Sequence, residues 1–135
     1  MSVLANWSST EPFSSDGYGL APTGFLARSS DGSVVAGSFN GQFDGAPLSP
    51  GTHDLVVTRT ASTVTVHQPL GDDTELAVRP PSSWQAGAPV EVTATTSDGR
   101  VLRTLQGTTV GDRIVFTCAG PGPAGPAPTY RLTVG

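Results

Sequence analysis

The two histidines, His53 and His67, and the single cysteine, Cys118, are the side chains best suited to metal binding or catalysis near neutral pH. Alternating apolar residues predict that segments 54–60 and 62–68 pair as a hairpin, which places both histidines near the same open end. They would then fit a shared metal site, but two histidines without a third ligand bind metal weakly. We therefore expect solvated histidines at strand ends and no metal site.

Cys118 is the only cysteine, which excludes an internal disulfide and a zinc site built from several cysteines. It falls on the same strand parity as Ile114 and Phe116, and this predicts a buried, inert thiol. A cysteine nucleophile needs a placed histidine, and the sequence shows no such pairing.

The densest acidic cluster is Asp72-Asp73-x-Glu75. A calcium loop needs alternating carboxylates, a glycine and a later glutamate, so this spacing predicts a polar turn, with weak surface calcium binding as the alternative. Lysine is absent, and the sequence contains neither a Gly-x-Ser-x-Gly elbow nor a His-Glu-x-x-His motif. A pair among the 11 acidic residues that cleaves glycosides is the one enzymatic arrangement left open. We expect a non-enzymatic protein that binds no cofactor.

The charge of the chain excludes several partners. The 135 residues include 11 acidic and seven basic residues, for a net charge of −4, and all basic residues are arginine. No basic stripe is present, so nucleic acid and anionic membrane surfaces are not expected partners. The residues after Met1 lack the basic and apolar regions of a secretory signal. We expect a chain that acts where it is made or leaves inside an assembled particle; an excised piece of a longer secreted protein is the alternative.

Period-2 alternation of apolar residues dominates the sequence, and no sustained helical periodicity is present. The pattern predicts an all-β protein, an antiparallel β-sandwich of about nine strands. The predicted strands are 24–28, 33–39, 54–60, 63–67, 74–79, 90–95, 100–106, 113–118 and 129–134. Alternate residues of a strand share one face, and the apolar face of these strands predicts a core. Its members are Val64, Val66, Leu76, Val78, Val90, Val92, Ile114, Phe116 and Leu132.

Turn residues separate these strands. Asp-Gly or Asn-Gly pairs stand at 16–17, 31–32, 40–41, 44–45 and 98–99, and they supply the positive φ angles of tight turns. The pairs at 31–32 and 98–99 are predicted to close two hairpins, and the segment 60–62 a third. Many hairpins indicate an antiparallel sheet with one buried face.

Residues 1–23 and 24–135 are predicted to differ in organisation. The first segment is rich in Ser, Pro and Gly and contains three aromatic residues without a regular pattern, so we expect an extended amino-terminal arm. Residues 24–135 are expected to form the sandwich domain, with 120–128 as a stiff proline-rich loop. The prolines at 80, 81 and 89 leave a division into 1–79 and 80–135 as the alternative.

Four aromatic residues are the candidate partner-binding residues: Trp7, Phe13 and Tyr18 in the arm, and Trp84 in a proline-rich loop. Tryptophan and tyrosine dominate protein interfaces and also stack on sugar rings. The competing interpretation is that both tryptophans fold back over the ends of the sandwich. We favour a protein partner for the arm, with a glycan as the alternative partner.

The segment Ala86–Thr95, its Asp98-Gly99 turn and the closing segment Tyr130–Val134 resemble an immunoglobulin-like or fibronectin-like β-sandwich over about the last 60 residues. Such sandwiches occur in capsid decoration and tail proteins of bacteriophages and in accessory domains of carbohydrate-active enzymes. The resemblance thus implies a domain whose function depends on its surfaces.

Our leading interpretation is a structural assembly protein, a virion component of a bacteriophage that binds capsid or tail subunits or further copies of itself. The missing signal peptide, the absence of catalytic motifs and the aromatic amino-terminal segment motivate it. The alternative is a carbohydrate-binding or accessory domain of a secreted enzyme, because residues 76–84 resemble strand-then-tryptophan segments of glycosidase β-domains.

Overall fold

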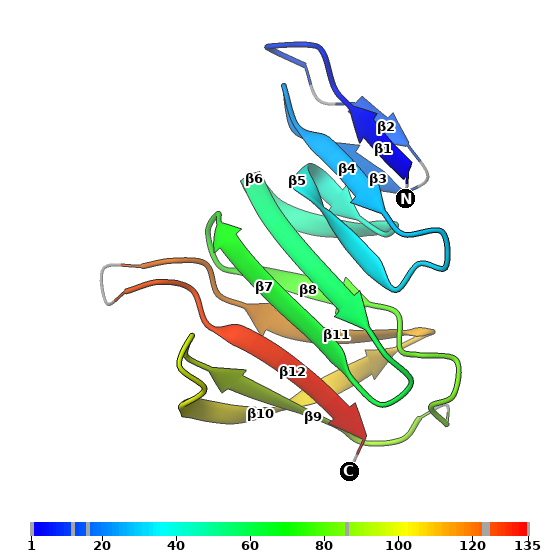
Figure 1. Cartoon of the computed structure of the whole chain (residues 1–135), viewed down its shortest axis with the longest axis vertical. Coiled ribbons are helices and arrows are strands. Elements are labelled where there is room, and N and C mark those ends of the chain that lie inside the picture. Colours follow the sequence, from blue (N-terminus) through cyan, green and yellow to red (C-terminus); the bar gives the residue numbers. More distant parts are fainter. Residues whose placement is uncertain (1, 12, 16, 86, 123–124, 135) are drawn as a thin grey trace.

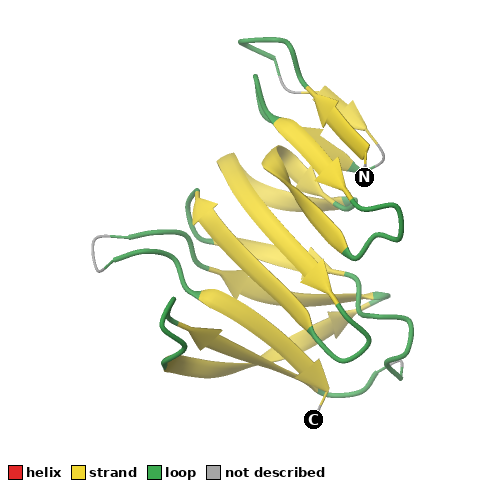
Figure 2. Cartoon of the chain, in the orientation of Figure 1, coloured by secondary structure: helices red, strands yellow, loops and turns green. Residues whose placement is uncertain are grey.

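The computed structural model describes residues 2–11, 13–15, 17–85, 87–122 and 125–134. These residues form strands and loops and no helix, which confirms the all-β prediction (Figure 2). No helix in these ranges is therefore long and apolar enough to span a membrane. The described strands are β1 (Ser2–Ala5), β2 (Phe13–Ser15), β3 (Tyr18–Leu20), β4 (Phe25–Arg28), β5 (Val34–Phe43), β6 (Ala46–Arg59), β7 (Val64–Leu70), β8 (Thr74–Val78), β9 (Val90–Thr95), β10 (Val101–Val110), β11 (Arg113–Cys118) and β12 (Thr129–Val134).

All described strands belong to one open antiparallel sheet. Its order is β1-β4-β5-β6-β7-β12-β9-β10-β11-β8, with β3 also paired to β5 and β2 paired to β3. The first four strands lie at one end of the molecule, and β9 to β12 lie toward the other (Figure 1). The carboxyl-terminal strand β12 lies between β7 and β9, so the last residues of the chain join strands from both halves of the sequence.

The three predicted hairpins are confirmed. The turn at 31–32 connects β4 to β5, the segment 60–62 connects β6 to β7, and the turn at 98–99 connects β9 to β10. Asn40-Gly41 is different, because it forms a bulge inside β5, where the pairing with β6 shifts register. The chain reverses at Asp44-Gly45 instead, where both residues have positive φ. The bulge explains why β5 and β6 are longer than predicted.

The sheet curls so that its carboxyl-terminal strands cover its own apolar face. Phe116 on β11 packs against Tyr130 on β12, with ring centroids 5.2 Å apart. In the sheet order, β9 and β10 lie between those two strands, so the contact crosses the interior and not the sheet. Figure 1 accordingly shows β8 and β11 behind β7 and β12. All nine predicted core residues are buried, and Cys118 is buried with them, so these predictions are confirmed.

Residues 1–23 differ from the predicted arm. Within this segment the structure describes β1, β2 and β3, and this raises the number of described strands from the expected nine or so to twelve. Ser2–Ala5 pair with the whole of β4, and Leu20 pairs with Phe39 of β5. The physical reason is that Leu20 and Tyr18 bury their side chains under β5, which the absence of regular alternation concealed. The amino-terminal segment therefore extends the sheet.

Replacing Phe116 with Ala should lower the free energy of unfolding by about 3–5 kcal/mol, because a large buried ring and its contact with Tyr130 are lost. Urea denaturation followed by circular dichroism measures the loss. Thr117→Ala is the matched control: it lies on the same strand with an exposed side chain and should change stability by less than about 1 kcal/mol. Equal losses in the two variants would contradict the described core.

Candidate functional site

Trp7 is the most exposed large apolar side chain among the described residues, with 93% of its surface accessible. It lies two residues after the end of β1, in the loop that leads toward β2. Single exposed apolar residues are ordinary, but a tryptophan exposed to this degree is unusual because its ring has a large apolar surface. The structure therefore rejects, for Trp7, the interpretation in which this residue folds back over the core.

The loop that presents Trp7 is held in place by the preceding residue. Asn6 is 8% exposed, and its Nδ2 donates to the carbonyl oxygens of Glu11 and Ala21 at 2.8 and 3.1 Å. Its Oδ1 accepts a hydrogen bond from the amide of Ser8 at 3.0 Å, and the carbonyl of Ser8 accepts one from the amide of Thr23. A buried amide with all these partners fixes the backbone on both sides of Trp7. The backbone that carries the indole is thus held in place before any partner binds.

The residues around Trp7 form an exposed apolar surface on the outer face of the sheet. Ala5 pairs with Phe25, and Val3 pairs with Ala27, so these side chains share one face of β1 and β4. Val3 is 67% and Phe25 45% exposed. Asn6 continues the pairing through its amide bond to the carbonyl of Gly24, and the exposed Trp7 follows beside this end of β1. We call Val3, Ala5, Trp7 and Phe25 the amino-terminal apolar face.

Phe13 and Tyr18 do not belong to this face. Phe13 is 47% exposed and pairs with the fully buried Leu20, so it lies at the rim of the core on the opposite face. Tyr18 is 6% exposed, and its ring contacts those of Phe39 and Phe43 at centroid distances of 5.8 and 5.2 Å. The expectation of an accessible Tyr18 is corrected: it packs against the rings of Phe39 and Phe43 on β5, and these contacts bury it.

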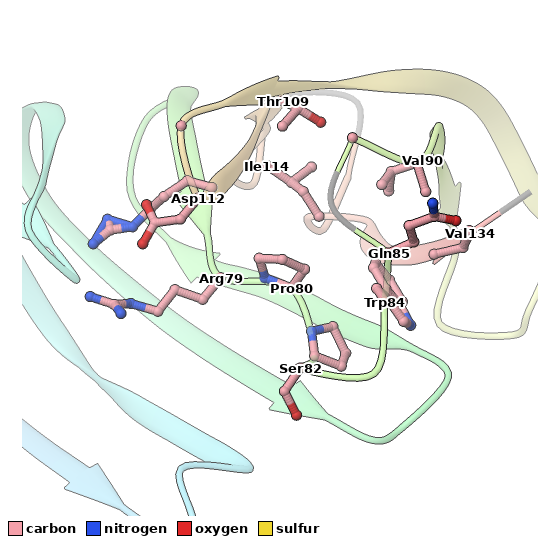
Figure 3. A pocket seen from close by; sticks show the side chains of 15 residues that line it. Arg79, Pro80, Ser82, Trp84, Gln85, Val90, Thr109, Asp112, Ile114 and Val134 are labelled. Atoms are coloured by element: carbon pink, nitrogen blue, oxygen red, sulfur yellow. The ribbon is translucent and has the colours of Figure 1, made fainter.

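Trp84 lies far from Trp7 along the chain and is half-buried. Its Nε1 donates to the carbonyl of Ala61 at 3.2 Å, and its ring packs against the core cluster. The interpretation of Trp84 as a residue folded over the end of the core is thereby favoured. One side of the ring still faces a hollow of about 330 Å³, which Pro80, Val90 and Ile114 also line (Figure 3). The four predicted aromatic residues are therefore not brought together at one site.

A second hollow, of about 550 Å³, was not predicted from the sequence. Arg28, Arg59 and Arg79 line it together with Tyr18, Asp31 and Asp44. Each arginine ends or directly follows a strand: β4, β6 and β8, respectively. That common position was a signal in the sequence, but only the curl of the sheet brings these three strand ends together. We call this hollow the arginine cleft.

The two histidines lie on opposite faces of the sheet. They therefore do not form the shared metal site that a placement at the same open end would have allowed. His53 lies on the same face of β6 as the buried Leu55 and is itself fully buried. Its Nδ1 lies 2.5 Å from Gln68 Oε1, and its Nε2 lies 2.8 Å from the carbonyl oxygen of Ser49. His67 is half-buried on the other face, where its Nδ1 donates to the carbonyl of Pro128. The prediction of a solvated His53 is corrected, because β6 extends past it and places it inside.

The acidic cluster at 72–75 has exposed side chains, and Asp73 accepts a hydrogen bond from the amide of Gly120 at 3.2 Å. Within the described ranges, no group of three or more histidine, cysteine or acidic side chains is arranged to hold a metal ion. Comparison with known proteins adds no relative: no family model, curated protein or solved structure matches this chain. Function must therefore be inferred from the surfaces described above.

Separate substitutions of Asn6 and Trp7 should show that Asn6 stabilises the fold, whereas Trp7 is exposed and contributes little to stability. Asn6→Ala should destabilise the fold by about 1–3 kcal/mol, because buried carbonyl oxygens lose their donor. Trp7→Ala should change stability by less than about 0.5 kcal/mol, because the indole is exposed. Thermal unfolding measures both effects. A large loss in Trp7→Ala would show that the indole packs on the chain itself.

The Cys118 thiol should resist alkylation in the folded protein. Burial raises its pKa from 9.0 to about 12, with the Asp73 charge adding to the effect. At pH 8 the folded chain then has about one thiolate in ten thousand molecules, against about one in ten for a solvated thiol. Because the folded state favours the neutral thiol, the stability associated with it is present below pH 9 and is lost as pH rises toward 12.

The measurement is the rate of iodoacetamide labelling at pH 8, with the urea-unfolded chain as the reference. We expect at least a hundredfold slower labelling of the folded chain, a conservative bound on the difference in thiolate population. Equal rates in the two states would contradict the buried, inert thiol.

Proposed function

We propose that this chain is a non-enzymatic structural protein that assembles through its amino-terminal apolar face and serves as a bacteriophage virion component, as a capsid decoration or tail protein. The observation on which the proposal rests is Trp7: a 93% exposed indole on a backbone fixed by a buried asparagine. Its partner is a capsid or tail subunit or another copy of the chain.

The edge of the sheet beside this face supports an assembly role. β1 ends the sheet order and consists of Ser-Val-Leu-Ala, without charge or proline. Soluble proteins commonly protect such edges with charged residues, proline or bulges, because an unprotected edge pairs with other strands. An exposed indole beside an uncharged edge offers both an anchor and backbone hydrogen-bonding groups to a partner.

The fold that we propose for the body is an antiparallel β-sandwich of the immunoglobulin-like or fibronectin-like type. The contact between Phe116 and Tyr130 across the interior supports two packed layers formed from one curled sheet. Sandwiches of this type occur in phage decoration and tail proteins. The sparse charge of the chain, 18 charged residues in 135, also suits a protein that functions by packing against others.

Sedimentation velocity of the purified chain, from about 1 to 100 µM, tests assembly through this face. We expect concentration-dependent association that Trp7→Ser weakens about 30-fold or more, since an interface anchor contributes roughly 2 kcal/mol. Leu102→Ser is the matched control, because Leu102 is 47% exposed at the other end of the molecule and lies outside the face. Equal weakening by both variants would contradict a specific interface.

Mass spectrometry of virions purified from cultures in which the gene is expressed tests the virion role. The chain should copurify with the particles in a fixed stoichiometric ratio, and the Trp7→Ser variant should be depleted. A chain that stays monomeric at about 100 µM and is absent from purified particles would refute the proposal.

The second candidate is a carbohydrate-binding or accessory domain of a secreted enzyme. The hollow beside Trp84 favours it, because an indole flanked by Pro80 and Val90 offers an apolar wall for a sugar ring (Figure 3). A glycan-array screen of the chain and of Trp84→Ala distinguishes the candidates. Binding that is lost in this variant and retained in Trp7→Ser would favour the glycan role.

A further inference from the structure

The sequence contains five pairs in which an asparagine or an aspartate precedes glycine. In such a pair the backbone nitrogen of the glycine can attack the side-chain carbonyl carbon of the preceding residue, because glycine has no Cβ to hinder the approach. Four of these pairs begin at Asp31, Asn40, Asp44 and Asp98 and lie wholly within the described residues, whereas Asp16 lies outside them. The surroundings of each side chain determine which pair can react.

The three described aspartates of these pairs are held by hydrogen bonds. Asp31 accepts bonds from the amide and the hydroxyl of Ser33 at 3.0 and 2.7 Å, and these bonds lower its pKa to about 2. Asp44 accepts a bond from Arg79 Nε at 2.9 Å. Asp98 accepts one from the hydroxyl of the threonine two residues before it, and this bond lowers its pKa. Such bonds favour the ionised carboxylate, which a nucleophile attacks poorly, so these three pairs are protected.

Asn40 differs from these aspartates because its side chain has no internal partner. It is half-buried on β5, and no hydrogen bond holds its side-chain amide within the described part of the chain. The neighbouring Phe39 is fully buried, so the alternation of side chains directs Asn40 away from the core. Its amide is also uncharged, unlike the ionised carboxylates of the other pairs. The carbonyl carbon of Asn40 is therefore open to attack.

Gly41 places the attacking nitrogen at an interruption of the sheet. The register of β5 with β6 pairs Asn40 and Gln42 but leaves Gly41 between them without a partner. Gly41 is exposed, and no described atom beyond its chain neighbours lies within 4 Å of a Cβ built there. Its φ of 89° is a conformation that glycine adopts readily. A bulged backbone unit in open space is free to turn toward the adjoining side chain.

We propose that Asn40 is a site of spontaneous deamidation. The Gly41 nitrogen loses its proton and bonds to Cγ of Asn40, the Cγ–Nδ2 bond breaks, and ammonia leaves with a proton taken from solvent. Water then opens the cyclic imide at one of its two carbonyl carbons and restores the N–H. Opening at Cγ gives aspartate, whereas opening at the backbone carbonyl carbon gives isoaspartate, in which the chain continues through the side-chain carbon atoms.

Either product adds a carboxylate to the outer face of β5 and makes the net charge of −4 more negative by one. Ser38, two residues before Asn40, pairs with Asp54, so the new carboxylate becomes a diagonal neighbour of Asp54 on the same face. Like charges in this arrangement repel and weaken the pairing of β5 with β6. The reaction requires neither proposed function, so the failure of either leaves it unaffected.

The test is incubation of the folded full chain at pH 8, followed by digestion and mass spectrometry with fragmentation that separates aspartate from isoaspartate. Asn6, the only other asparagine, is the internal control, because it is buried, bonded to Glu11 and Ala21, and followed by tryptophan. We expect conversion at Asn40 to be about tenfold faster than at Asn6 or more, because Asn6 reacts only after its hydrogen bonds break. Lowering the pH to 6 should slow the reaction at Asn40, since the attacking nitrogen must lose its proton.

The same incubation in urea separates the contribution of the fold from that of the sequence. Unfolding removes the hydrogen bonds of Asp31, Asp44 and Asp98, so isoaspartate should then form at these positions as well as at Asn40. In the folded chain it should form at Asn40 alone among the four described pairs. The rate at Asn40 should differ by less than about fivefold between the two states, because the fold gives this pair little protection.

Two variants of Asn40 test the site and its consequence. Asn40→Gln should abolish the conversion, because glutamine would have to form a larger ring. Asn40→Asp reproduces one product and should lower the midpoint of thermal unfolding by about 1–3 °C relative to the uncharged Asn40→Gln, because of the nearby Asp54.

Three outcomes would overturn the inference. An unchanged Asn40 in the folded chain, with conversion only in urea, would show that the fold protects this pair. Equal rates at Asn6 and Asn40 would show that burial and hydrogen bonding do not select the site. Isoaspartate formed in the folded chain as fast at Asp31, Asp44 and Asp98 as at Asn40 would show that their bonds give no protection.

Discussion

No helix covers the sheet in the described part of the chain, so the curl of the sheet itself buries its apolar face, and this constraint organises the molecule. The curl that satisfies it places Phe116 against Tyr130, although two strands separate them in the sheet. Tyr130 then stabilises the curl through its hydroxyl, which accepts hydrogen bonds from the amide of Ala119 and from Arg103 Nη2 at 2.9 and 3.0 Å. One buried side chain thus joins the end of β11, strand β10 and strand β12.

Where the segment after β11 passes the segment after β7, the backbone is too crowded for ordinary side chains. A Cβ atom at Gly120 would lie 1.8 Å from the carbonyl oxygen of Gly71, so this position requires glycine. The polar groups buried nearby bond to one another: Gln68 Nε2 donates to the carbonyl of Cys118, and its Oε1 contacts His53. Such satisfied polar groups allow these two segments to pack together with their buried side-chain partners paired.

The sequence predicted the features that depend on local pattern. Strict alternation fixed which side chains of β7, β9 and β12 face inward, and Asp-Gly pairs located the turns. It could not predict β1, β2 and β3, because β2 and β3 have three residues each and the Ser-Val-Leu-Ala sequence of β1 does not alternate between apolar and polar residues. Tyr18 appeared exposed for the same reason, since only its long-range placement beneath β5 buries it.

The candidate sites were less predictable because each combines distant segments. Trp7 was identified from residue type alone, but the fixed backbone that carries it depends on Asn6 bonding to Ala21, fifteen residues away. The arginine cleft combines residues 28, 59 and 79, and nothing in the sequence between them indicates that three strand ends meet. Residue types thus suggested what the surfaces could bind, while topology decided which surfaces exist.

Successive side chains of β4 point to opposite sides of the sheet, and this separates the amino-terminal apolar face from the arginine cleft. Phe25 faces outward with the amino-terminal apolar face, whereas Arg28 follows the inward parity of Leu26 and lines the arginine cleft. The two surfaces are therefore on opposite sides of the same four-residue strand. A partner that covers Trp7 and Phe25 on one side of β4 therefore leaves the arginine cleft on the other side uncovered.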